Sequence, residues 1–220
     1  MLFEMPPGGG MEVYMLVFLF IAAAVCAYLI AGLNPAIIFS VGIYKQDIRT
    51  LGSKNPGFTN FRRTFGNRWA WWVLTIDLLK SAVVVSVFAT LIHLFGGDFS
   101  FGAAYTGFFA LLGHSFPLWY GFKGGKGFLA YLAVVFVIDW RAGLIATCVM
   151  LILLFTTKYM SLSTIIGMLT CPVTLILVKA DVPTICFCSV GVLFMIWRHK
   201  ENIIRLAKGN ETKFKVRTKS

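Results

Sequence analysis

The sequence predicts an all-α integral membrane protein with seven transmembrane segments, of which the fourth and fifth are short. Of its 220 residues 58% are hydrophobic and only nine are acidic, which is too apolar for an ordinary soluble domain. Several apolar runs reach about 18 residues or more, the length that crosses a bilayer. The basic residues lie between these runs, so the net charge of +11 fits membrane topology and anionic headgroups better than nucleic acid.

The first apolar segment, 12–31, is interpreted as a retained span. It lacks the basic region that precedes the core of a signal peptide, and no clear cleavage site follows it. Asn34 and Pro35 end the apolar pattern. A mixed, amphipathic stretch (37–44) and a polar loop (45–68) come next.

The second and third segments, 69–95 and 101–119, are separated by a turn at Gly96 and Gly97. The following stretch, 128–156, allows two interpretations because an Asp-Trp-Arg sequence interrupts it. One kinked helix would give six spans in total. Two short helices, 128–138 and 142–156, would give seven.

Segments 162–178 and 182–197 complete the apolar pattern, and charge decides the count. With seven spans, 17 of the 20 basic residues fall on one side, with the N-terminus outside and the C-terminus cytoplasmic. With six, the basic tail would face outward, against the positive-inside tendency. We therefore predict seven spans in a single membrane-embedded domain (1–211), followed by a basic cytoplasmic tail (212–220).

The stretch 113–127 reads GHSFPLWYGFKGGKG and lies where a membrane helix meets water. Its glycines lack Cβ, so their N–H groups could turn toward a ligand, and its lysines add two cations. The sequence therefore indicates a phosphate site, although the Walker spacing is absent. The alternative is a positively charged interfacial turn. The candidate binding residues are Lys123, Gly124, Gly125, Lys126 and Gly127.

Two further basic segments carry polar side chains. In the loop 45–68, short polar residues precede Arg63, whose guanidinium can bind a phosphate or carboxylate; they are Ser53, Asn55, Thr59 and Asn60. The alternative is a polar loop with its own hydrogen-bond network.

In the C-terminal segment, His199 and Asn202 share a helix face, and Arg198 lies beside them. The alternative is an ordinary basic stop at the end of a span. The predicted topology places both segments and the glycine loop on the cytoplasmic side, where they can meet at one interfacial site.

Other ionisable residues have competing interpretations. Asp77 and Lys80 lie within the second span, at a spacing that suits either a functional site or a mutually satisfied structural pair. His114 is expected to stay neutral and bond to the loop backbone. His93 and Asp98 match an H-x4-D acyltransferase pattern, but they fall on the outer turn and are interpreted as a coincidence.

No metal site or disulfide is expected from the cysteines. All five lie in apolar segments without a CxxC pair, and we expect them to be small buried hydrophobic side chains. They are Cys26, Cys148, Cys171, Cys186 and Cys188.

Together, these segments closely resemble the PlsY family of bacterial acyl-phosphate:glycerol-3-phosphate acyltransferases. The resemblance covers roughly residues 32–211. It rests on GSKNPGFTNFRR at 52–63, GHSFPLWYGFKGGKG at 113–127 and RHKENIIRLAKGNE at 198–211, in that order, with weaker similarity in DLLK at 77–80 and KYMSLST at 158–164.

The resemblance implies a seven-helix, multi-pass enzyme of the bacterial inner membrane, with its active site at the cytoplasmic face. It implies that a fatty acyl phosphate acylates position 1 of glycerol 3-phosphate, giving lysophosphatidic acid and inorganic phosphate. We expect a monomer that uses no cofactor.

The resemblance also implies roles for individual residues. By matching position, Ser53 and Arg63 correspond to essential residues, and His199 and Asn202 to residues important for activity. The second motif supplies the phosphate loop for glycerol 3-phosphate. Ser161 matches a serine near the donor site, and Glu211 matches a residue needed for integrity.

An acyl phosphate is a mixed anhydride with a good leaving group, so no acyl-enzyme is required. Arg63, Lys123, Lys126 and Arg198 would neutralise the two phosphates. His199 would act as general base, unless the donor's own phosphate oxygen takes the proton.

Two rival functions remain open. A membrane phosphatase or phosphotransferase also needs cations around phosphate, but the K-x6-RP signature is absent. A transporter or non-catalytic scaffold is disfavoured because polar residues within the spans are few and no inverted repeat is apparent.

Overall fold

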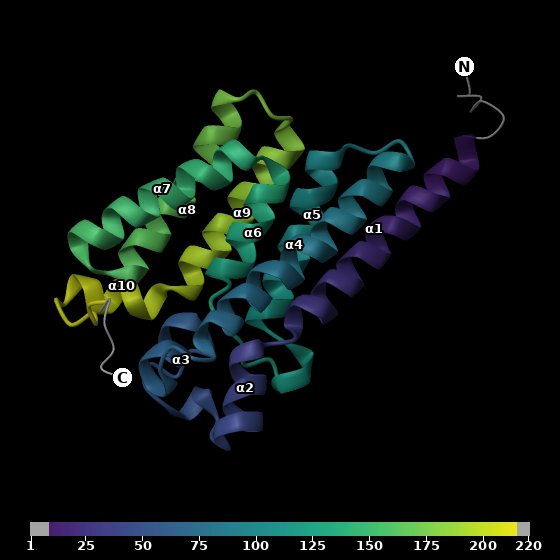
Figure 1. Ribbon diagram of the computed structural model, residues 1–220. Helices are drawn as coiled ribbons and strands as arrows, with labels where there is room; N and C mark the ends of the chain where they lie inside the picture. The colour runs from purple at the N-terminus through teal and green to yellow at the C-terminus, as the bar shows by residue number, and fades with distance from the viewer. Residues whose placement is uncertain (1–8, 215–220) are drawn as a thin grey trace.

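The computed structural model describes residues 9–214, which form helices and loops and contain no strand (Figure 1). The α-helices are α1 (Gly9–Gly32), α2 (Pro35–Tyr44), α3 (Phe58–Phe65), α4 (Ala70–Leu94), α5 (Phe99–Ser115), α6 (Phe128–Ile138), α7 (Trp140–Thr157), α8 (Met160–Leu177), α9 (Val182–Arg198) and α10 (Lys200–Ala207). Two 3-10 turns lie at Ile48–Thr50 and Leu118–Tyr120. The predicted all-α fold is confirmed.

Each of the seven predicted apolar segments contains a helix, namely α1 and α4 to α9. The third begins earlier than predicted, because the Asp98 carboxylate accepts a hydrogen bond from the N–H of Phe101 (2.7 Å) and caps α5. It also ends at Ser115 rather than at Trp119, two residues before Pro117, which cannot continue a helix.

The ambiguous stretch 128–156 forms two separate helices, α6 and α7. Asp139 between them is extended (φ −156°, ψ 117°), and its side chain accepts a hydrogen bond from the N–H of Arg141. The interruption in the apolar pattern is therefore the N-cap of α7.

Four described stretches are long and apolar enough to cross a bilayer by themselves: 10–44, 70–94, 140–157 and 160–177. Taken as one span, α9 and α10, which meet at a bend of 58°, would be a fifth. The number of crossings and their orientation therefore stay predictions, whereas the seven apolar helices are observed.

The long N-terminal helix α1 packs through a stripe of small residues. Its buried alanines recur every four residues, at Ala23, Ala27 and Ala31. A Cβ added to Gly113 of α5 would lie 2.1 Å from the carbonyl oxygen of Tyr28, so the two backbones nearly touch. Small residues allow this close approach, as is common in membrane bundles. The other faces of α1 expose apolar side chains.

The cysteine prediction is partly wrong. Cys171 and Cys188 are buried, but Cys148 and Cys186 are exposed, and Cys26 is half-buried. The exposed thiols lie on α7 and α9, helices that also expose large apolar side chains. A weakly polar thiol is tolerated on such faces, so an apolar segment did not imply burial.

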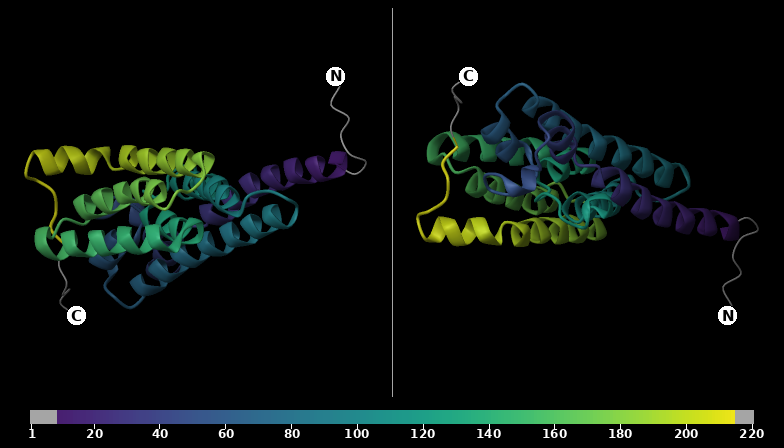
Figure 2. Two further views of the ribbon diagram at one scale, coloured as in Figure 1. Left: turned by 90° about the horizontal axis from the view of Figure 1, so that it is seen from above. Right: turned by 90° about the horizontal axis from the view of Figure 1, so that it is seen from below.

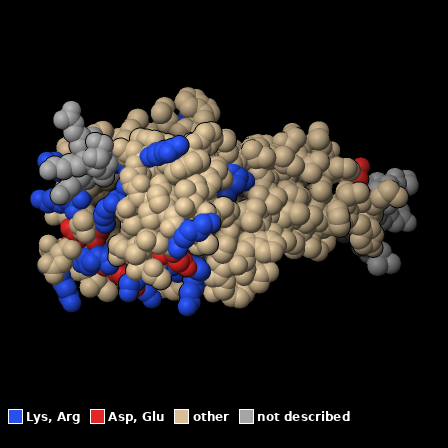
Figure 3. Space-filling model, turned by 60° about the horizontal axis from the view of Figure 1, so that its bottom comes forward, with Lys and Arg blue, Asp and Glu red and all other residues tan. Residues whose placement is uncertain are grey.

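The polar segments gather at the end of the bundle away from the N-terminus. There α2, α3 and α10 lie below the long helices (Figure 1), and Lys and Arg side chains cluster over that end (Figure 3). A second apolar cluster, including Ile48, Phe61 and Val73, fixes α3 against α4. The predicted convergence of the basic segments is thus observed.

Candidate active site

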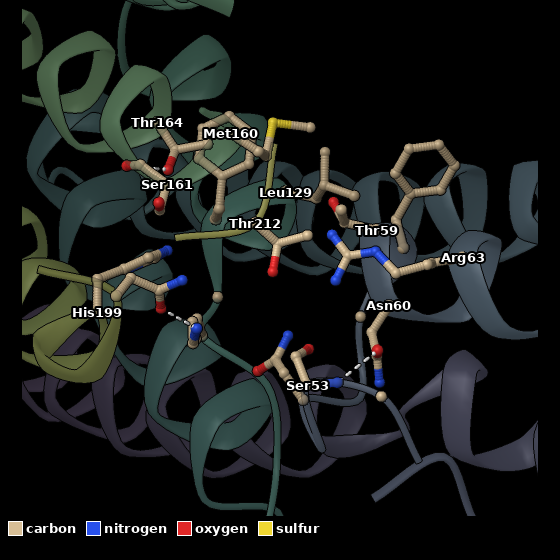
Figure 4. Close-up of a pocket in the computed structure, with 18 of the residues that line it drawn as sticks. Ser53, Thr59, Asn60, Arg63, Leu129, Met160, Ser161, Thr164, His199 and Thr212 are labelled. Atoms are coloured by element: carbon tan, nitrogen blue, oxygen red, sulfur yellow. Dashed lines mark hydrogen bonds between the residues drawn. The ribbon is translucent and has the colours of Figure 1, made fainter. Parts of the chain in front are cut away.

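A cavity of about 450 Å³ lies where these segments meet (Figure 4). Its walls come from the first polar loop and α3, the start of α6, the start of α8, the junction of α9 with α10, and the segment after α10. The predicted site residues that line it are Ser53, Asn55, Thr59, Asn60, Arg63, Lys126, Gly127, Ser161, His199 and Asn202.

Asn60 organises the first loop. Its Oδ1 accepts the N–H of Ser53 (2.9 Å), and its Nδ2 donates to the carbonyl of Leu51 (3.0 Å). Gly52 has φ +56°, and a Cβ there would lie 2.3 Å from Asn60 Oδ1. The loop's own hydrogen-bond network, weighed above as an alternative to a binding site, therefore exists, and it presents Ser53 to the cavity.

Helix α3 turns one face to the core and the other to the cavity. Phe61 is fully buried in the core, whereas Thr59 and Arg63, four residues apart, line the cavity. Phe58 is buried and also forms part of the cavity wall. The Arg63 guanidinium points into the cavity (Figure 4). Within residues 9–214 it has no hydrogen-bond or ion-pair partner, so its charge is available to an anion.

The glycine loop does not work as expected at Gly124 and Gly125. Their N–H groups donate to the carbonyls of Ser115 (3.2 Å) and His114 (3.1 Å), so they are not available to a ligand. A Cβ at Gly124 would lie 2.2 Å from the His114 carbonyl oxygen, and one at Gly125 would lie 2.3 Å from His114 Nε2. These two glycines permit close packing behind the cavity and do not line it.

The start of α6, rather than Gly124 and Gly125, offers N–H groups to the cavity. Gly127 is its N-cap (φ +84°), and Gly127, Phe128 and Leu129 line the cavity. The first bond of the helix runs from the N–H of Tyr131 to the Gly127 carbonyl (2.8 Å), which leaves the earlier N–H groups without an intrahelical partner. A helix N-terminus facing a cavity favours phosphate. In the sequence, this helix start was indicated by the apolar run that begins after Gly127.

The two lysines of the loop separate. Lys123 is exposed and lies outside the cavity, contrary to its predicted role. Lys126 lines the cavity, and its Nζ donates to Oδ1 of Asn202. Burial, together with nearby Arg205, lowers the pKa of Lys126 to about 8, although Glu211 opposes the shift.

His199 lies at the bend between α9 and α10. Its Nδ1 is 2.8 Å from the carbonyl oxygen of Met195, an acceptor, so Nδ1 carries the proton and Nε2 is free to accept one. Burial lowers the pKa of His199 to about 4, and Lys126 and Arg198 add to the shift. The ring is therefore neutral near pH 7.

Arg198 faces away from the cavity. Its guanidinium donates to the carbonyls of Gly125 (3.0 Å) and Gly124 (3.3 Å) and lies 4.8 Å from the Phe116 ring centre. It thus holds the glycine loop in place and does not reach the position predicted for a phosphate ligand.

Glu211 joins three elements. It accepts hydrogen bonds from Ser161 of α8 (2.8 Å) and from Asn202 (2.7 Å) and Arg205 (2.7 Å) of α10. Burial would raise the pKa of Glu211, but these three donors lower it. Because Asn202 Nδ2 faces Glu211, its Oδ1 faces Lys126. The predicted structural role of Glu211 therefore has a geometric basis.

Asp77 of the second span lines the cavity, and Lys80 of the same helix pairs with it. Lys80 Nζ lies 2.8 Å from Asp77 Oδ1 and donates to the carbonyl of Leu33 (2.7 Å), so the pair is mutually satisfied. His114 Nδ1 lies 3.5 Å from the same carboxylate oxygen. The ring of His114 thus makes its polar contacts with side chains, although it packs against Gly125, and the bond from the loop N–H of Gly125 goes to the His114 carbonyl.

His93 and Asp98 lie at the far end of α4. His93 Nδ1 is 3.3 Å from the Gly97 carbonyl, and Asp98 caps α5. Neither lines the cavity, as expected for a coincidental match.

Known proteins share both the sequence and this fold. The family model described as "Glycerol-3-phosphate acyltransferase" matches residues 21–209. The protein of that name from Rhizobium etli strain CIAT 652 is 36% identical over 88% of this chain and 90% of its own length. The one from Francisella tularensis is 34% identical over 92% and 97%, respectively.

A crystal structure of PlsY, an integral membrane glycerol 3-phosphate acyltransferase, in its glycerol 3-phosphate form superposes with a TM-score of 0.80. It is 31% identical and covers 91% of this chain and 96% of that one. The lysophosphatidic acid form gives a TM-score of 0.79 at 30% identity, covering 89% and 95%. The chain therefore belongs to the PlsY family of integral membrane glycerol-3-phosphate acyltransferases.

Proposed function

We propose that this protein transfers a fatty acyl group from an acyl phosphate to position 1 of sn-glycerol 3-phosphate. The products are lysophosphatidic acid and inorganic phosphate. The observation that carries the proposal is one cavity lined by two cationic groups from different elements, each of which can bind one phosphate. Arg63 forms one phosphate-binding site, and Lys126 forms the other together with the start of α6.

This reaction requires two phosphate-binding sites. Acyl phosphate and glycerol 3-phosphate are both anions, and they repel each other unless cations compensate each charge. The phosphate group of glycerol 3-phosphate binds to Lys126 and to the first N–H groups of α6. The phosphate of the acyl donor lies at Arg63, next to the hydroxyls of Ser53 and Thr59, which also line the cavity.

Apolar side chains in the cavity wall can contact the acyl chain of the donor. Leu129 and Met160 line the same cavity beside the polar residues (Figure 4), and so does Phe58. They suit the first carbons of an acyl chain whose remainder extends among the membrane helices.

In the reaction, the position 1 hydroxyl oxygen attacks the acyl carbonyl carbon. The bond from that carbon to the phosphate oxygen breaks, and phosphate leaves with the electron pair. The hydroxyl proton passes either to Nε2 of His199 or to an oxygen of the leaving phosphate. Burial, Lys126 and Arg198 make His199 a weak base, but the charges of the bound phosphates oppose the effect of the two cations and raise its basicity.

The protein acts as a monomer in the bacterial inner membrane, with the cavity open to the cytoplasm. The polar end carries most of the basic residues, which favours its placement inside. Seven crossings with the N-terminus outside satisfy this placement.

The test uses purified protein, radiolabelled glycerol 3-phosphate and palmitoyl phosphate, with a chelator present and without nucleotide. Labelled lysophosphatidic acid together with an equal amount of phosphate is the expected result. Phosphate release that does not depend on glycerol 3-phosphate would instead identify a phosphatase. Absence of both products would contradict an acyl-phosphate-dependent reaction.

A further inference from the structure

The segment that follows α10, residues 210–214, is fixed at both of its ends. At one end, the N–H of Asn210 donates to the Arg205 carbonyl (2.8 Å), and the carboxylate of Glu211 accepts the three bonds described above. At the other end, the N–H of Phe214 donates to the Lys158 carbonyl (2.6 Å). The segment thus crosses from α10 to the turn between α7 and α8 (Figure 2).

Aromatic contacts add to these anchors. The Arg62 guanidinium of α3 lies 5.2 Å from the ring centre of Phe214, and Nζ of Lys213 lies 5.8 Å from the Tyr159 ring centre. The segment therefore connects three parts of the cavity wall. The first three residues of the predicted tail, 212–214, contact the bundle, and residues 215–220 lie outside the described part.

Thr212 is held between these two anchors and lines the cavity. Its side chain lies between His199 and Arg63, with the hydroxyl oxygen directed into the cavity (Figure 4). In the described part of the chain this hydroxyl has no hydrogen-bond partner. It therefore faces the same space as the guanidinium of Arg63, and both can donate to one anion.

We propose that residues 210–214 form a wall of the active site and that Thr212 binds substrate through its hydroxyl. The hydroxyl donates to the phosphate group that Arg63 holds, which is the phosphate of the acyl donor. This inference rests on the proposed function for the identity of the ligand. Glycerol 3-phosphate offers the same phosphate chemistry, so the experiment measures the two substrates separately.

Steady-state kinetics of the full-length protein compare Thr212→Val, which keeps the shape but removes the donor, with Thr212→Ser, which keeps the donor. We expect Thr212→Val to raise KM for palmitoyl phosphate about tenfold, as for one hydrogen bond to a charged group, and to change KM for glycerol 3-phosphate less than twofold. Thr212→Ser should stay within about twofold of the wild type. The matched control is Asn210→Ala, an exposed residue of the same segment outside the cavity.

Two kinetic outcomes would overturn the assignment. If KM rises for glycerol 3-phosphate instead, Thr212 contacts the acceptor rather than the donor. If Thr212→Val behaves like the wild type toward both substrates, the hydroxyl contacts neither phosphate.

A binding measurement separates this inference from the proposed reaction. The midpoint of thermal unfolding in detergent is recorded with palmitoyl phosphate, with palmitate as the control for the acyl chain. Even if the wild type transfers no acyl group, Thr212→Val should lose most of the extra stabilisation by palmitoyl phosphate, and Thr212→Ser should keep it. Equal stabilisation of all three proteins would refute the contact. Unliganded midpoints show whether a variant folds, and Thr212→Ala, which also lacks the hydroxyl, replaces Thr212→Val if that variant does not fold.

Discussion

The charge of Lys126 should control the alkaline limb of the pH profile. Its Nζ lies in the cavity wall, and its pKa is lowered to about 8, first by burial and then by Arg205. A phosphate binds the ammonium form more strongly than the neutral amine. As pH rises through 8, the fraction of protein that can bind glycerol 3-phosphate therefore falls.

The size of the effect follows from this pKa. At pH 7 about nine-tenths of the Lys126 side chains are protonated, and at pH 9 about one-tenth are, so kcat/KM for glycerol 3-phosphate should fall by up to about tenfold per pH unit above 8. Bound phosphate stabilises the ammonium, so the corresponding limb of kcat should lie at higher pH. Lys126→Met removes a charge-assisted hydrogen bond and should lower kcat/KM about 10- to 150-fold at pH 7.

The assay is acyl transfer from palmitoyl phosphate between pH 6 and pH 10, with Lys126→Arg as the diagnostic variant. Arginine keeps its charge over this range, so the alkaline limb should disappear. The matched control is Lys123→Ala, three residues away, exposed and outside the cavity, and it should retain the limb and the activity. An identical limb in Lys126→Arg would show that a substrate or another group titrates, and would refute this reasoning.

Three further substitutions test other parts of the site. His199→Ala should lower the single-turnover rate about 10²- to 10⁴-fold if Nε2 takes the proton; a loss below tenfold would leave that role to the leaving phosphate. Arg63→Ala should raise KM for palmitoyl phosphate at least about tenfold, because its guanidinium faces the cavity and has no other partner among residues 9–214, and Arg63→Lys should recover only part of the loss; an unchanged KM would show that Arg63 does not bind the donor phosphate. Gly125→Ala should destabilise the protein by about 1–3 kcal/mol, since the new Cβ would lie 2.3 Å from His114 Nε2. Thermal unfolding measures this loss against Gly42→Ala, whose Cβ would meet nothing within 4 Å; equal midpoints would contradict the tight packing.

The apolar segments and their grouping were predictable because hydropathy acts over whole helices. The polar segments 45–68, 119–127 and 198–211 each interrupt or end the apolar pattern, and their charge placed them on one side of the membrane before any contact was known. The cap at Asp139 was also readable as an interruption, although the sequence left open whether it kinked one helix or separated two.

The direction of individual groups was not predictable, because tertiary contacts decide it. Nothing local distinguishes Lys123 from Lys126, yet only the second turns toward Asn202. The N–H groups of Gly124 and Gly125 suit a phosphate equally well in sequence, but the carbonyls at the end of α5 receive them. Thr212 was not predicted because it follows the last recognisable motif. It reaches the cavity because the neighbouring Glu211 and Phe214 are bound to other helices and loops.

The ion pair of Asp77 and Lys80 beside the cavity has a consequence for the membrane as an electrical barrier. A water-filled site that penetrates a bilayer shortens the path that a proton must cross. Here Asp77 lines the site and is neutralised by Lys80, and the core includes the fully buried Val85 and Ala89 of the same helix. A charge moving past them would enter hydrocarbon-like surroundings without a partner, at a cost of several kcal/mol. In the proposed reaction, this arrangement would let both anionic reactants enter from one side without discharging the ion gradient across the membrane.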